Sequence, residues 1–344
     1  MNSPVGIKEV AALAGVSLGT VSNVINGRAG VAKLTEQRVL AAIEQLGYVR
    51  NDSARQLRAG RSRQIAIVVL DVANPFFTDV VRGAEDALDE RDVIVVVCDS
   101  AQRADREERY LNQLAQQRVQ GVLITPVDET NGVRLEELSR RGTPVILVDR
   151  GAGLFNLCSV TVNDLLGGRL VGEHLVAMGH RRIAFVGGPP TLRQVVDRRK
   201  GLGLAARGAD ITDVPTGDLT VAAGRGAASE IVDLPAGTRP TAIACANDLL
   251  ALGVLQELTR RGVRVPGDIA IVGYDDIEFA AAAAVPLSSV RQPRAELGRT
   301  AVELLEDELN AKGHHTHRQV VFQPELVLRA SSSEPVVRHA DVSS

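Results

Sequence analysis

Several apolar segments that we interpret as strands are each followed closely by a polar side chain. Small molecules bound to parallel sheets lie beyond the carboxyl ends of the strands. Carboxylate and amide groups there can form paired hydrogen bonds with neighbouring hydroxyls. Four such residues together indicate a site for a polyhydroxylated ligand, although any one alone would serve as a helix cap or turn former. They are Asn74, Asp149, Asn247 and Asp275.

A second polar set lies near the N-terminus, on the outer face of a helix that we expect after Ser17. Asparagine pairs with adenine, an exposed leucine contacts the methyl group of thymine, and hydroxyls hydrogen-bond to phosphates. The face favours DNA binding, and the alternative is a helical bundle with an ordinary polar surface. Its residues are Leu18, Gly19, Thr20, Ser22, Asn23 and Asn26.

We considered three patterns associated with catalysis, cofactor binding or metal binding, and none of them has the sequence context that its function requires. Residues 15–19 match G-x-S-x-G, but an esterase elbow needs a strand before the serine, and a helix is expected here. The chain contains neither a Walker loop nor a dinucleotide-binding fingerprint. No Cys or carboxylate lies within the group His314, His315 and His317, which favours an exposed loop over a metal site. We therefore expect no catalytic residue, no metal and no cofactor.

The N-terminal polar set is held by a predicted helix-turn-helix. Gly15 would end the first helix, Ser17 would cap the second, and a third is expected from about residue 34 to Gly47. The first helix carries apolar residues at the spacing of one helical face, namely Ile7, Val10, Ala11 and Ala14.

From Gln64 onward, short β-branched segments alternate with amphipathic helical stretches. Strands that are apolar on both faces are typical of parallel sheets, and intervening helices indicate βαβ units. The pattern predicts a doubly wound α/β body. We expect its strands at residues 65–70, 93–98, 121–125, 145–148, 183–186, 242–245 and 269–272.

The net charge of −3 over 344 residues hides an uneven distribution. Residues 1–63 carry nine Lys or Arg against four Asp or Glu, whereas the remainder carries 30 against 38. A basic head on an acidic body indicates that the head binds a polyanion, and a solvated basic linker is the alternative. The three widely spaced cysteines suit a reducing cytoplasm.

The run from Ile7 to Asn26 matches a long pattern, an aliphatic residue followed by x-[DE]-V-A-x-x-A-G-V-S-x-x-T-V-S-x-V-[IL]-N. It closely resembles the LacI/GalR family of bacterial repressors. The chain departs from the family at Ala32, Glu36 and Arg50, which removes a capping side chain and a positive charge near the expected phosphates. The resemblance implies DNA contacts by Ile7, Ser17, Leu18, Gly19, Thr20, Ser22, Asn23 and Asn26.

Residues 51–57 match the family's hinge, N-x-x-A-x-x-L, and linker is expected up to residue 63. A helix this short is marginal in water by itself. In the family, two such helices pair in the minor groove, where a leucine wedges into the central base step and bends the duplex. The resemblance therefore assigns DNA contacts to Asn51, Ala54, Arg55 and Leu57.

The resemblance continues in the body, at Asn74-Pro75-Phe76-Phe77, Val148-Asp149-Arg150 and VGYDD. It implies a sensor similar to periplasmic sugar-binding proteins, with an effector between two Rossmann-like lobes. The head would span residues 1–50, one lobe about 64–161 plus 291–322, the other about 162–290 plus 323–330, and a flexible tail 331–344. Effector contacts are implied for Asn74, Phe76, Phe77, Asp149, Arg198, Asn247, Asp275 and Gln292.

The class of effector stays open at this point. The polar set favours a sugar or sugar derivative, but the chain has no Trp and only 3% aromatic residues on which a sugar ring could stack. Phe155 and Phe279 are further candidates for stacking. The pair Arg198-Arg199 would admit a phosphorylated or carboxylated ligand, and a nucleoside or purine is another alternative.

Together, these features predict a cytoplasmic, homodimeric transcriptional repressor that binds double-stranded operator DNA under the control of a small-molecule effector. One alternative is a solute-binding module without a DNA role, which the lack of an apolar signal core opposes. Another is an enzyme acting in the cleft, which the lack of a nucleophile–base pair opposes. The longest apolar stretches are strand-sized, so no membrane partner is expected.

Overall fold

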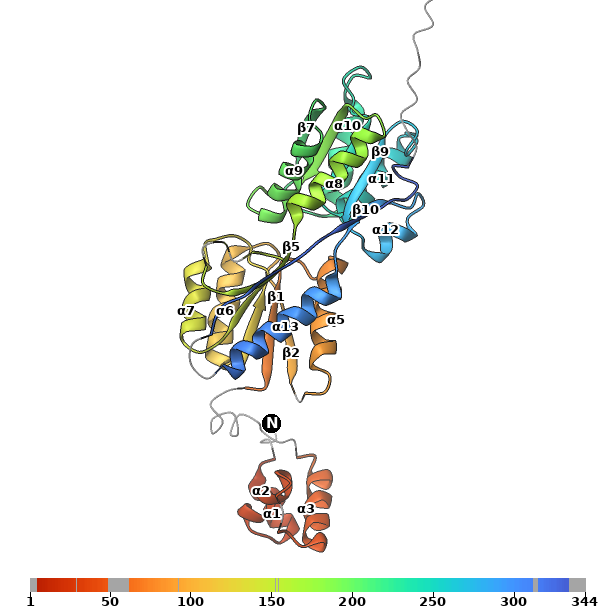
Figure 1. The fold of residues 1–344 in the computed structure, drawn as a ribbon. Coiled ribbons are helices and arrows are strands. Elements are labelled where there is room, and N and C mark those ends of the chain that lie inside the picture. The colour runs from red at the N-terminus through yellow and green to blue at the C-terminus, as the bar shows by residue number, and fades with distance from the viewer. Residues whose placement is uncertain are drawn as a thin grey trace, which may run out of the picture. The chain divides into compact units, whose positions relative to one another are not determined.

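The computed structural model describes residues 5–28, 30–48, 62–91, 93–151, 153, 155–311 and 315–333. The chain divides into two compact units, Met1–Arg61 and Ser62–Ser344. Figure 1 labels most of their helices and strands. The predicted hinge at residues 51–57 lies outside the described residues.

The N-terminal unit contains a helix-turn-helix, as predicted. Its helices are α1 (Ile7–Ala14), α2 (Leu18–Ile25) and α3 (Lys33–Leu46). Gly15 ends α1 in the left-handed conformation at φ 63°, and Ser17 begins α2 by accepting a hydrogen bond from the Thr20 backbone N–H at 3.1 Å. One side chain from each helix is fully buried in the small core, at Val10, Val21 and Val39.

The second unit contains two six-stranded sheets, each the centre of one lobe. The first lobe has the strand order β11-β5-β4-β3-β1-β2, with every neighbouring pair parallel. Its strands are β1 (Gln64–Val69), β2 (Ile94–Asp99), β3 (Gly121–Ile124), β4 (Val145–Val148), β5 (Cys158–Val162) and β11 (Gln319–Phe322). Its helices are α5 (Pro75–Leu88), α6 (Ala104–Gln117), α7 (Gly132–Arg140) and α13 (Arg294–Asn310).

The second lobe has the order β12-β10-β9-β8-β6-β7, and only the β10–β12 pair is antiparallel. Its strands are β6 (Arg182–Gly187), β7 (Asp210–Pro215), β8 (Ala242–Cys245), β9 (Ala270–Asp275), β10 (Ser288–Arg291) and β12 (Glu325–Val327). Its helices are α8 (Asp164–Ala177), α9 (Arg193–Ala205), α10 (Val221–Asp233), α11 (Asp248–Arg260) and the short α12 (Glu278–Ala282). None of the described helices is both long and apolar enough to cross a membrane.

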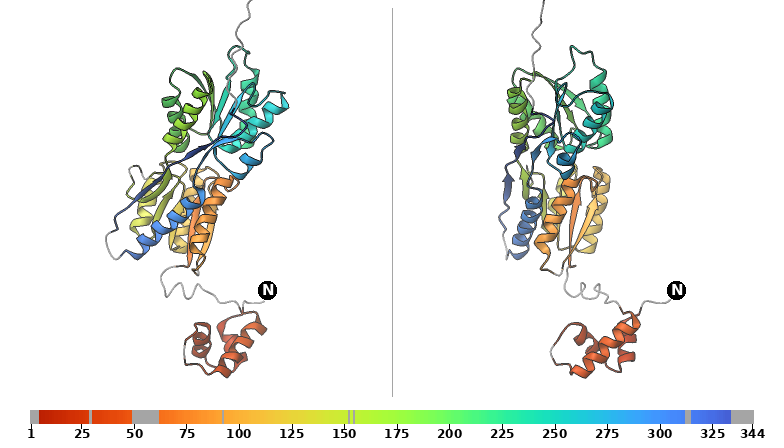
Figure 2. Two further views of the ribbon diagram at one scale, coloured as in Figure 1. Left: turned by 45° about the vertical axis from the view of Figure 1, so that its right-hand side comes forward. Right: turned by 90° about the vertical axis from the view of Figure 1, so that its right-hand side faces the viewer.

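The chain passes between the lobes after β5, after β10 and after β11. Figure 2 shows the last passage as the dark-blue strands that run from one lobe into the other. The predicted fold class, a helical head with an α/β sensor of two Rossmann-like lobes, is confirmed. All seven predicted strands are present, but the pattern missed β5, β7, β10, β11 and β12. β7, β11 and β12 lie at sheet edges, where half-exposed strands carry polar residues and lose the apolar signal.

Two glycines let α8 and α9 approach until their backbones touch. A Cβ atom on Gly168 would lie 2.0 Å from the carbonyl oxygen of Arg198, and one on Gly201 would lie 2.1 Å from that of Leu165. No side chain fits at such distances, so the close contact requires glycine on both helices. The contact holds the backbone of Arg198 against the start of α8.

Candidate functional site

A pocket with about 480 Å³ of empty volume, open solvent included, lies between the two lobes. The first lobe lines it with residues near the carboxyl ends of its strands, and the second lobe does the same from α9, β9 and the residues after β8. Among the lining residues are seven of the eight predicted effector contacts, Asn74, Phe76, Phe77, Asp149, Arg198, Asn247 and Asp275. The eighth, Gln292, lies behind Asp275 and donates a 2.7 Å hydrogen bond to its Oδ1. We call this pocket the cleft.

Arg198 is the buried cation of the cleft. Its Nε donates to Asp164 Oδ1 and its Nη1 to the Ala246 carbonyl, both at 2.7 Å. The same Nη1 lies 3.7 Å from Asp275 Oδ1. The guanidinium carbon stands 3.7 Å from the centre of the Tyr274 ring, in cation–π geometry. Burial lowers the pKa of Arg198, but the charges of Asp164 and its other neighbours outweigh burial and raise it, so the side chain is always charged.

Two carboxylates occupy equivalent positions in the lobes. Asp149 follows β4 and Asp275 ends β9, each the third strand in the order of its sheet. Both residues have positive φ, 55° and 103°, a strained conformation that clusters at functional sites. Burial and the Asp164 charge raise the pKa of Asp149 to about 8. Burial raises the pKa of Asp275 to about 6, against the opposing charge of Arg198.

Some side-chain oxygens in and behind the cleft lack a hydrogen-bond partner among the described residues. Gln194 Nε2 donates 2.9 Å hydrogen bonds to the Oδ2 and the carbonyl of Asp149. Asp149 Oδ1 and Gln292 Oε1 are buried and find no hydrogen-bond partner among the described residues. Buried polar atoms are normally hydrogen-bonded, so Asp149 Oδ1 in the cleft and Gln292 Oε1 behind it have unused hydrogen-bonding capacity.

The two asparagines of the set serve as helix caps and also line the cleft. Asn74 Oδ1 accepts from the Phe76 N–H at 3.0 Å at the start of α5, and Asn247 Oδ1 accepts from the Leu250 N–H at 2.9 Å at the start of α11. The capping interpretation is therefore correct for both. Their role in ligand binding stays a prediction.

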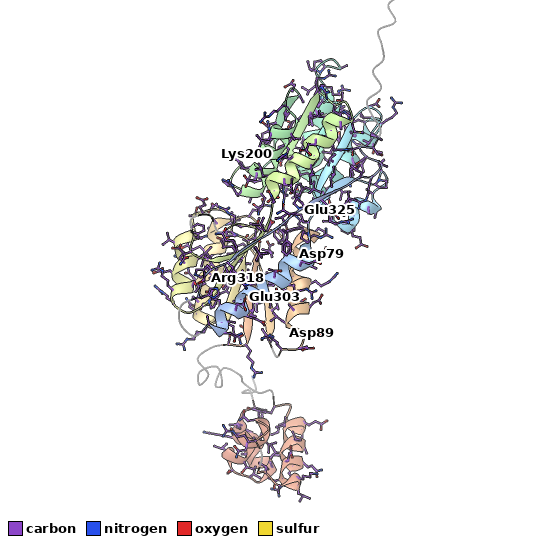
Figure 3. The ribbon with its side chains drawn as sticks, viewed as in Figure 1. Asp79, Asp89, Lys200, Glu303, Arg318 and Glu325 are labelled. Carbon is purple, nitrogen blue, oxygen red and sulfur yellow. The ribbon has the colours of Figure 1, made fainter. Side chains whose placement is uncertain are left out.

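Arg198 and Arg199 do not both face the cleft, so they do not form the pair that would admit a phosphorylated or carboxylated ligand. Arg199 pairs instead with Asp213 on β7, and it does not line the cleft. The next residue, Lys200, is exposed at the edge of the second lobe (Figure 3). Successive residues of a helix point about 100° apart, so α9 directs only one of the two arginines inward. Among the described residues that line the cleft, Arg198 is therefore the single arginine.

The aromatic side chains available to the cleft are Phe76 and Phe77, whose rings meet edge to face with centroids 5.0 Å apart. The other two candidates are elsewhere: Phe155 packs against Gly132 in the first lobe, and Phe279 is 56% exposed on α12. Gln194 also lines the cleft, although it was not among the predicted effector contacts. A glutamine in the first turn of a helix has no local signal that separates it from a surface residue.

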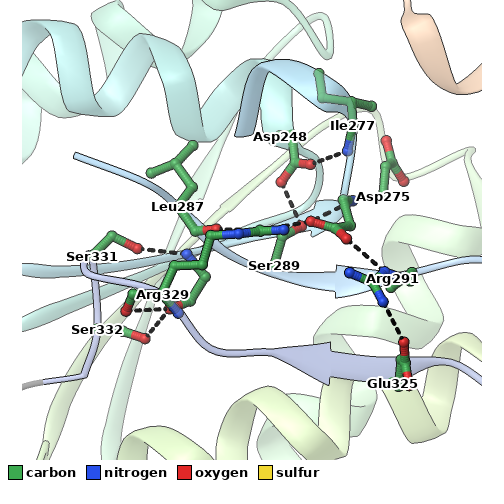
Figure 4. Close-up of polar contacts among 12 residues, drawn as sticks. Asp248, Asp275, Ile277, Leu287, Ser289, Arg291, Glu325, Arg329, Ser331 and Ser332 are labelled. Atoms are coloured by element: carbon green, nitrogen blue, oxygen red, sulfur yellow. Dashed lines mark hydrogen bonds and ion pairs between the residues drawn. The ribbon is translucent and has the colours of Figure 1, made fainter. Parts of the chain in front are cut away.

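Behind the cleft, a network of hydrogen bonds joins the loop after β9 to the end of the described chain (Figure 4). Ser289 Oγ donates to Asp248 Oδ1 at 2.6 Å and accepts from the Asp276 N–H at 3.0 Å. Arg329 lies 2.6 Å from Asp276 Oδ1. Ser331 Oγ donates to the Ile271 carbonyl at 2.6 Å, so this network holds the backbone that carries Asp275.

The flexible tail was expected to begin at Ser331, and its first two residues are instead buried. Ser331 and Ser332 have no exposed surface, and Ser332 Oγ lies 2.7 Å from Ser288 Oγ. The polar composition of the segment gave no sign of this, because its hydroxyls are satisfied by strands some 40 to 60 residues away in the chain. Residues 334–344 lie outside the described part.

The predicted DNA-binding face of α2 is accessible. Leu18 is 45% exposed, and Gly19 and Asn26 are also exposed. Asn26 Nδ2 donates to the Ser22 carbonyl at 2.6 Å, and the Ser17 hydroxyl caps the helix. Thr20, Ser22 and Asn23 are partly exposed, whereas Ile7 packs against the core of the head. Asn51, Ala54, Arg55 and Leu57 lie outside the described residues.

Comparison with known proteins identifies both units. Residues 6–51 match the family of bacterial regulatory proteins named lacI, and residues 173–332 match the periplasmic binding protein-like domain. The HTH-type transcriptional repressor PurR of Aliivibrio fischeri (strain ATCC 700601 / ES114) is 34% identical over 333 residues, which cover 95% of this chain and 98% of that protein. PurR of Vibrio vulnificus (strain CMCP6) is 32% identical over 327 residues, covering 94% and 97%.

Comparison with solved structures leads to the same family. The Lac repressor dimer bound to operator and the anti-inducer ONPF has a TM-score of 0.81 at 28% identity, covering 96% of this chain and 99% of that chain. The complex of the transcriptional regulator CelR with cellobiose has a TM-score of 0.69 at 33% identity, covering 95% and 99%. With a helix-turn-helix, a two-lobed sensor and a relative 34% identical over nearly its whole length, this chain belongs to the LacI family of bacterial regulatory proteins.

Proposed function

We propose that the chain acts as a homodimeric repressor whose α2 face binds operator DNA and whose cleft binds a neutral, polyhydroxylated effector. The curated relatives are named transcriptional repressors rather than enzymes, in agreement with the predicted class. The Lac repressor neighbour is a dimer bound to operator. Each head of such a dimer would read one half of a near-palindromic site. The three cysteines form no disulfide, which suits a cytoplasmic protein.

The observation that carries the effector proposal is the charge and hydrogen-bond state of the cleft. Arg198 is already paired with Asp164 and lies near Asp275, so no positive charge is left over for an anionic ligand. Asp149 Oδ1, which lines the cleft, has no hydrogen-bond partner among the described residues. Because the pKa of Asp149 is raised to about 8, its carboxyl can donate a hydrogen bond near neutral pH, whereas the ionised form accepts. A ligand hydroxyl both donates and accepts, so it satisfies either form. Two relatives of known structure carry cellobiose and ribose, which supports a sugar.

A nucleoside or purine is the second candidate, and the apolar walls of the cleft favour it. Leu70, Phe76 and Phe77 face the space from the first lobe, and Val195 and Leu219 from the second. A flat ring placed between such walls buries both of its faces. A ring N–H or a ring nitrogen would then pair with Asp149 Oδ1, which lines the cleft.

The test is operator binding measured by fluorescence anisotropy at fixed salt, with DNA from upstream of the protein's own gene. A panel of pentoses, hexoses, nucleosides, purines and sugar phosphates is added in turn. The proposal expects tight binding to one near-palindromic site and a shift in its affinity by a neutral hydroxylated compound. By reciprocity, operator DNA must change the affinity for that compound by the same factor. A shift caused only by sugar phosphates would overturn the effector class, and loss of all site preference would overturn the repressor role.

A further inference from the structure

Four side chains of the types that bind transition metals meet in the first lobe. They belong to Cys158, Glu308, His315 and His317, and one ligand atom from each lies within 4.8 Å of all the others. We call this group the Cys158 cluster. It lies at the amino end of β5, whereas the cleft lies at the carboxyl ends of the strands. The Cys158 cluster is therefore separate from the effector site.

Three elements bring these residues together. Cys158 is the first residue of β5, and Glu308 is in the last turn of α13. The two histidines precede β11, which pairs with β5 in parallel so that Gln319 lies opposite Ser159. The pairing places the segment before β11 beside the thiol, 157 residues away along the chain. This corrects the expectation that the histidines form a loop without a Cys or carboxylate.

The spacing of the donor atoms fits one tetrahedral ion. Zinc bonds of about 2.0–2.3 Å place neighbouring tetrahedral ligand atoms about 3.3–3.8 Å apart. Cys158 Sγ lies 3.1 Å from His315 Nε2 and 3.6 Å from His317 Nδ1. His317 Nδ1 lies 3.9 Å from Glu308 Oε2. The remaining pairs of ligand atoms lie within 4.8 Å of one another, so an ion at the centre of these atoms needs side-chain shifts of up to about 1 Å.

Glu308 provides independent evidence for a cation at the Cys158 cluster. Ser139 Oγ donates to Glu308 Oε1 at 3.2 Å, which orients the carboxylate as second partners of metal ligands do. The other oxygen, Oε2, is buried and has no hydrogen-bond partner among the described residues. The side chain is only 10% exposed. A buried carboxylate oxygen without a donor is costly, and a bound cation would neutralise it. The Arg318 N–H, 3.4 Å from Cys158 Sγ, faces the sulfur.

We propose that Cys158, Glu308, His315 and His317 bind one Zn²⁺ ion. Thiolate and imidazole ligands select zinc-like ions over magnesium and calcium, and four protein ligands around one ion are typical of structural sites. The ion fastens the end of α13 and the segment before β11 to the first residue of β5. Figure 3 marks the place by Arg318, the neighbour of His317, on the first lobe beside α13. Zinc binding therefore stabilises the first lobe.

The experiment uses full-length protein without a histidine tag, stripped with a chelator and titrated with Co²⁺. Thiolate coordination produces a sulfur-to-cobalt charge-transfer band in the near ultraviolet, which saturates at one ion per chain and disappears when Zn²⁺ is added. Cys158→Ser loses the band. Cys98→Ser, which changes another buried thiol of the same lobe, keeps it. Absence of a saturable band in the wild type, or its persistence in Cys158→Ser, overturns the proposal.

A second variant guards against misfolding of Cys158→Ser. His317→Ala keeps the thiol, and circular dichroism verifies its fold. Loss of an outer-shell partner weakens metal sites by about 10–100-fold, so loss of a ligand weakens Zn²⁺ binding by at least about 100-fold in competition with a chromophoric chelator. Zn²⁺ raises the Tm of the wild type and not that of His317→Ala. Equal affinity of the two folded proteins for Zn²⁺ rejects the site.

Discussion

The DNA-binding face of the head and the effector cleft carry their functional groups in opposite ways. On α2 the side chains are exposed or half-exposed, and the bonds among them, such as Asn26 to Ser22, are local. In the cleft, Arg198, Asp149 and Asp275 are buried and joined to residues from several elements. Binding in the head can therefore be changed without changing stability. In the cleft, Arg198 and Asp275, which are proposed to recognise a ligand, also hold the second lobe together, and Asp149 joins the two lobes through Gln194.

The largest expected effect on stability is that of Arg198→Ala, which tests whether the cleft residues hold the fold together. Removal of the guanidinium leaves Asp164 buried without its ion-pair partner, which costs about 3–5 kcal/mol in unfolding free energy for pairs of this kind. Urea denaturation of the sensor measures the loss. The matched control is Arg199→Ala, whose partner Asp213 is 58% exposed, and a change below about 1 kcal/mol is expected there. Similar values for the two variants would contradict the difference between buried and exposed arginines.

A second variant tests how the cleft is positioned. In Gly168→Ala the new methyl group meets the carbonyl of Arg198 at 2.0 Å, so α8 and α9 must separate. Overpacking of this kind costs about 1–3 kcal/mol. The effector response should weaken in parallel, because the backbone of Arg198 moves. Gly226→Ala on α10 has open space around the added methyl, so it should stabilise by up to about 1 kcal/mol through helix propensity and leave the effector response unchanged. If Gly168→Ala is also silent, the close helix contact does not position the cleft.

The unfolding free energy of the sensor should also depend on pH, because a buried carboxyl of the cleft has a raised pKa. The pKa of Asp149 is raised from its usual 3.8 to about 8 by burial and the charge of Asp164. The folded state therefore holds a proton that the unfolded state releases. The resulting stabilisation is complete below pH 4 and is lost as pH rises toward 8, at about 1 kcal/mol per pH unit. Asp149→Asn should flatten this slope in urea titrations between pH 5 and 8. An unchanged slope would show that Asp149 is ionised in the folded protein.

The smallest expected effect on stability is in the head. Asn23→Ala should weaken operator binding by about 1–2 kcal/mol, roughly one base contact, and alter unfolding by less than about 0.5 kcal/mol. Anisotropy with operator and with non-specific DNA separates lost recognition from lost charge attraction. Gln45→Ala, exposed on α3, serves as the control and should bind both DNAs as the wild type does. Equal loss on both DNAs would remove Asn23 from base recognition.

Much of this molecule could be predicted from local patterns. The first two helices of the head follow from apolar spacing, a capping Ser17 and the left-handed Gly15, all within 20 consecutive residues. The polar residues after β1, β4 and β8 and at the end of β9 were also correctly gathered into one pocket, because the carboxyl ends of parallel strands share one edge. The direction of Arg199, the burial of Ser331 and the contribution of Gln194 could not be predicted, since each depends on a partner far away in the chain.

The sequence by itself determined the family, the two kinds of unit and the candidates for DNA and effector contact, because periodicity and motif spacing are properties of neighbouring residues. Only the tertiary structure decided the rest. The β5–β11 pairing places Cys158 beside two histidines about 160 residues later. The packing of α9 directs Arg198 and not Arg199 into the cleft, and burial raises the pKa of Asp149. The pKa of a buried carboxyl, the direction of a side chain and the grouping of possible metal ligands all depend on which distant segments come into contact. The packing of each whole lobe decides those contacts.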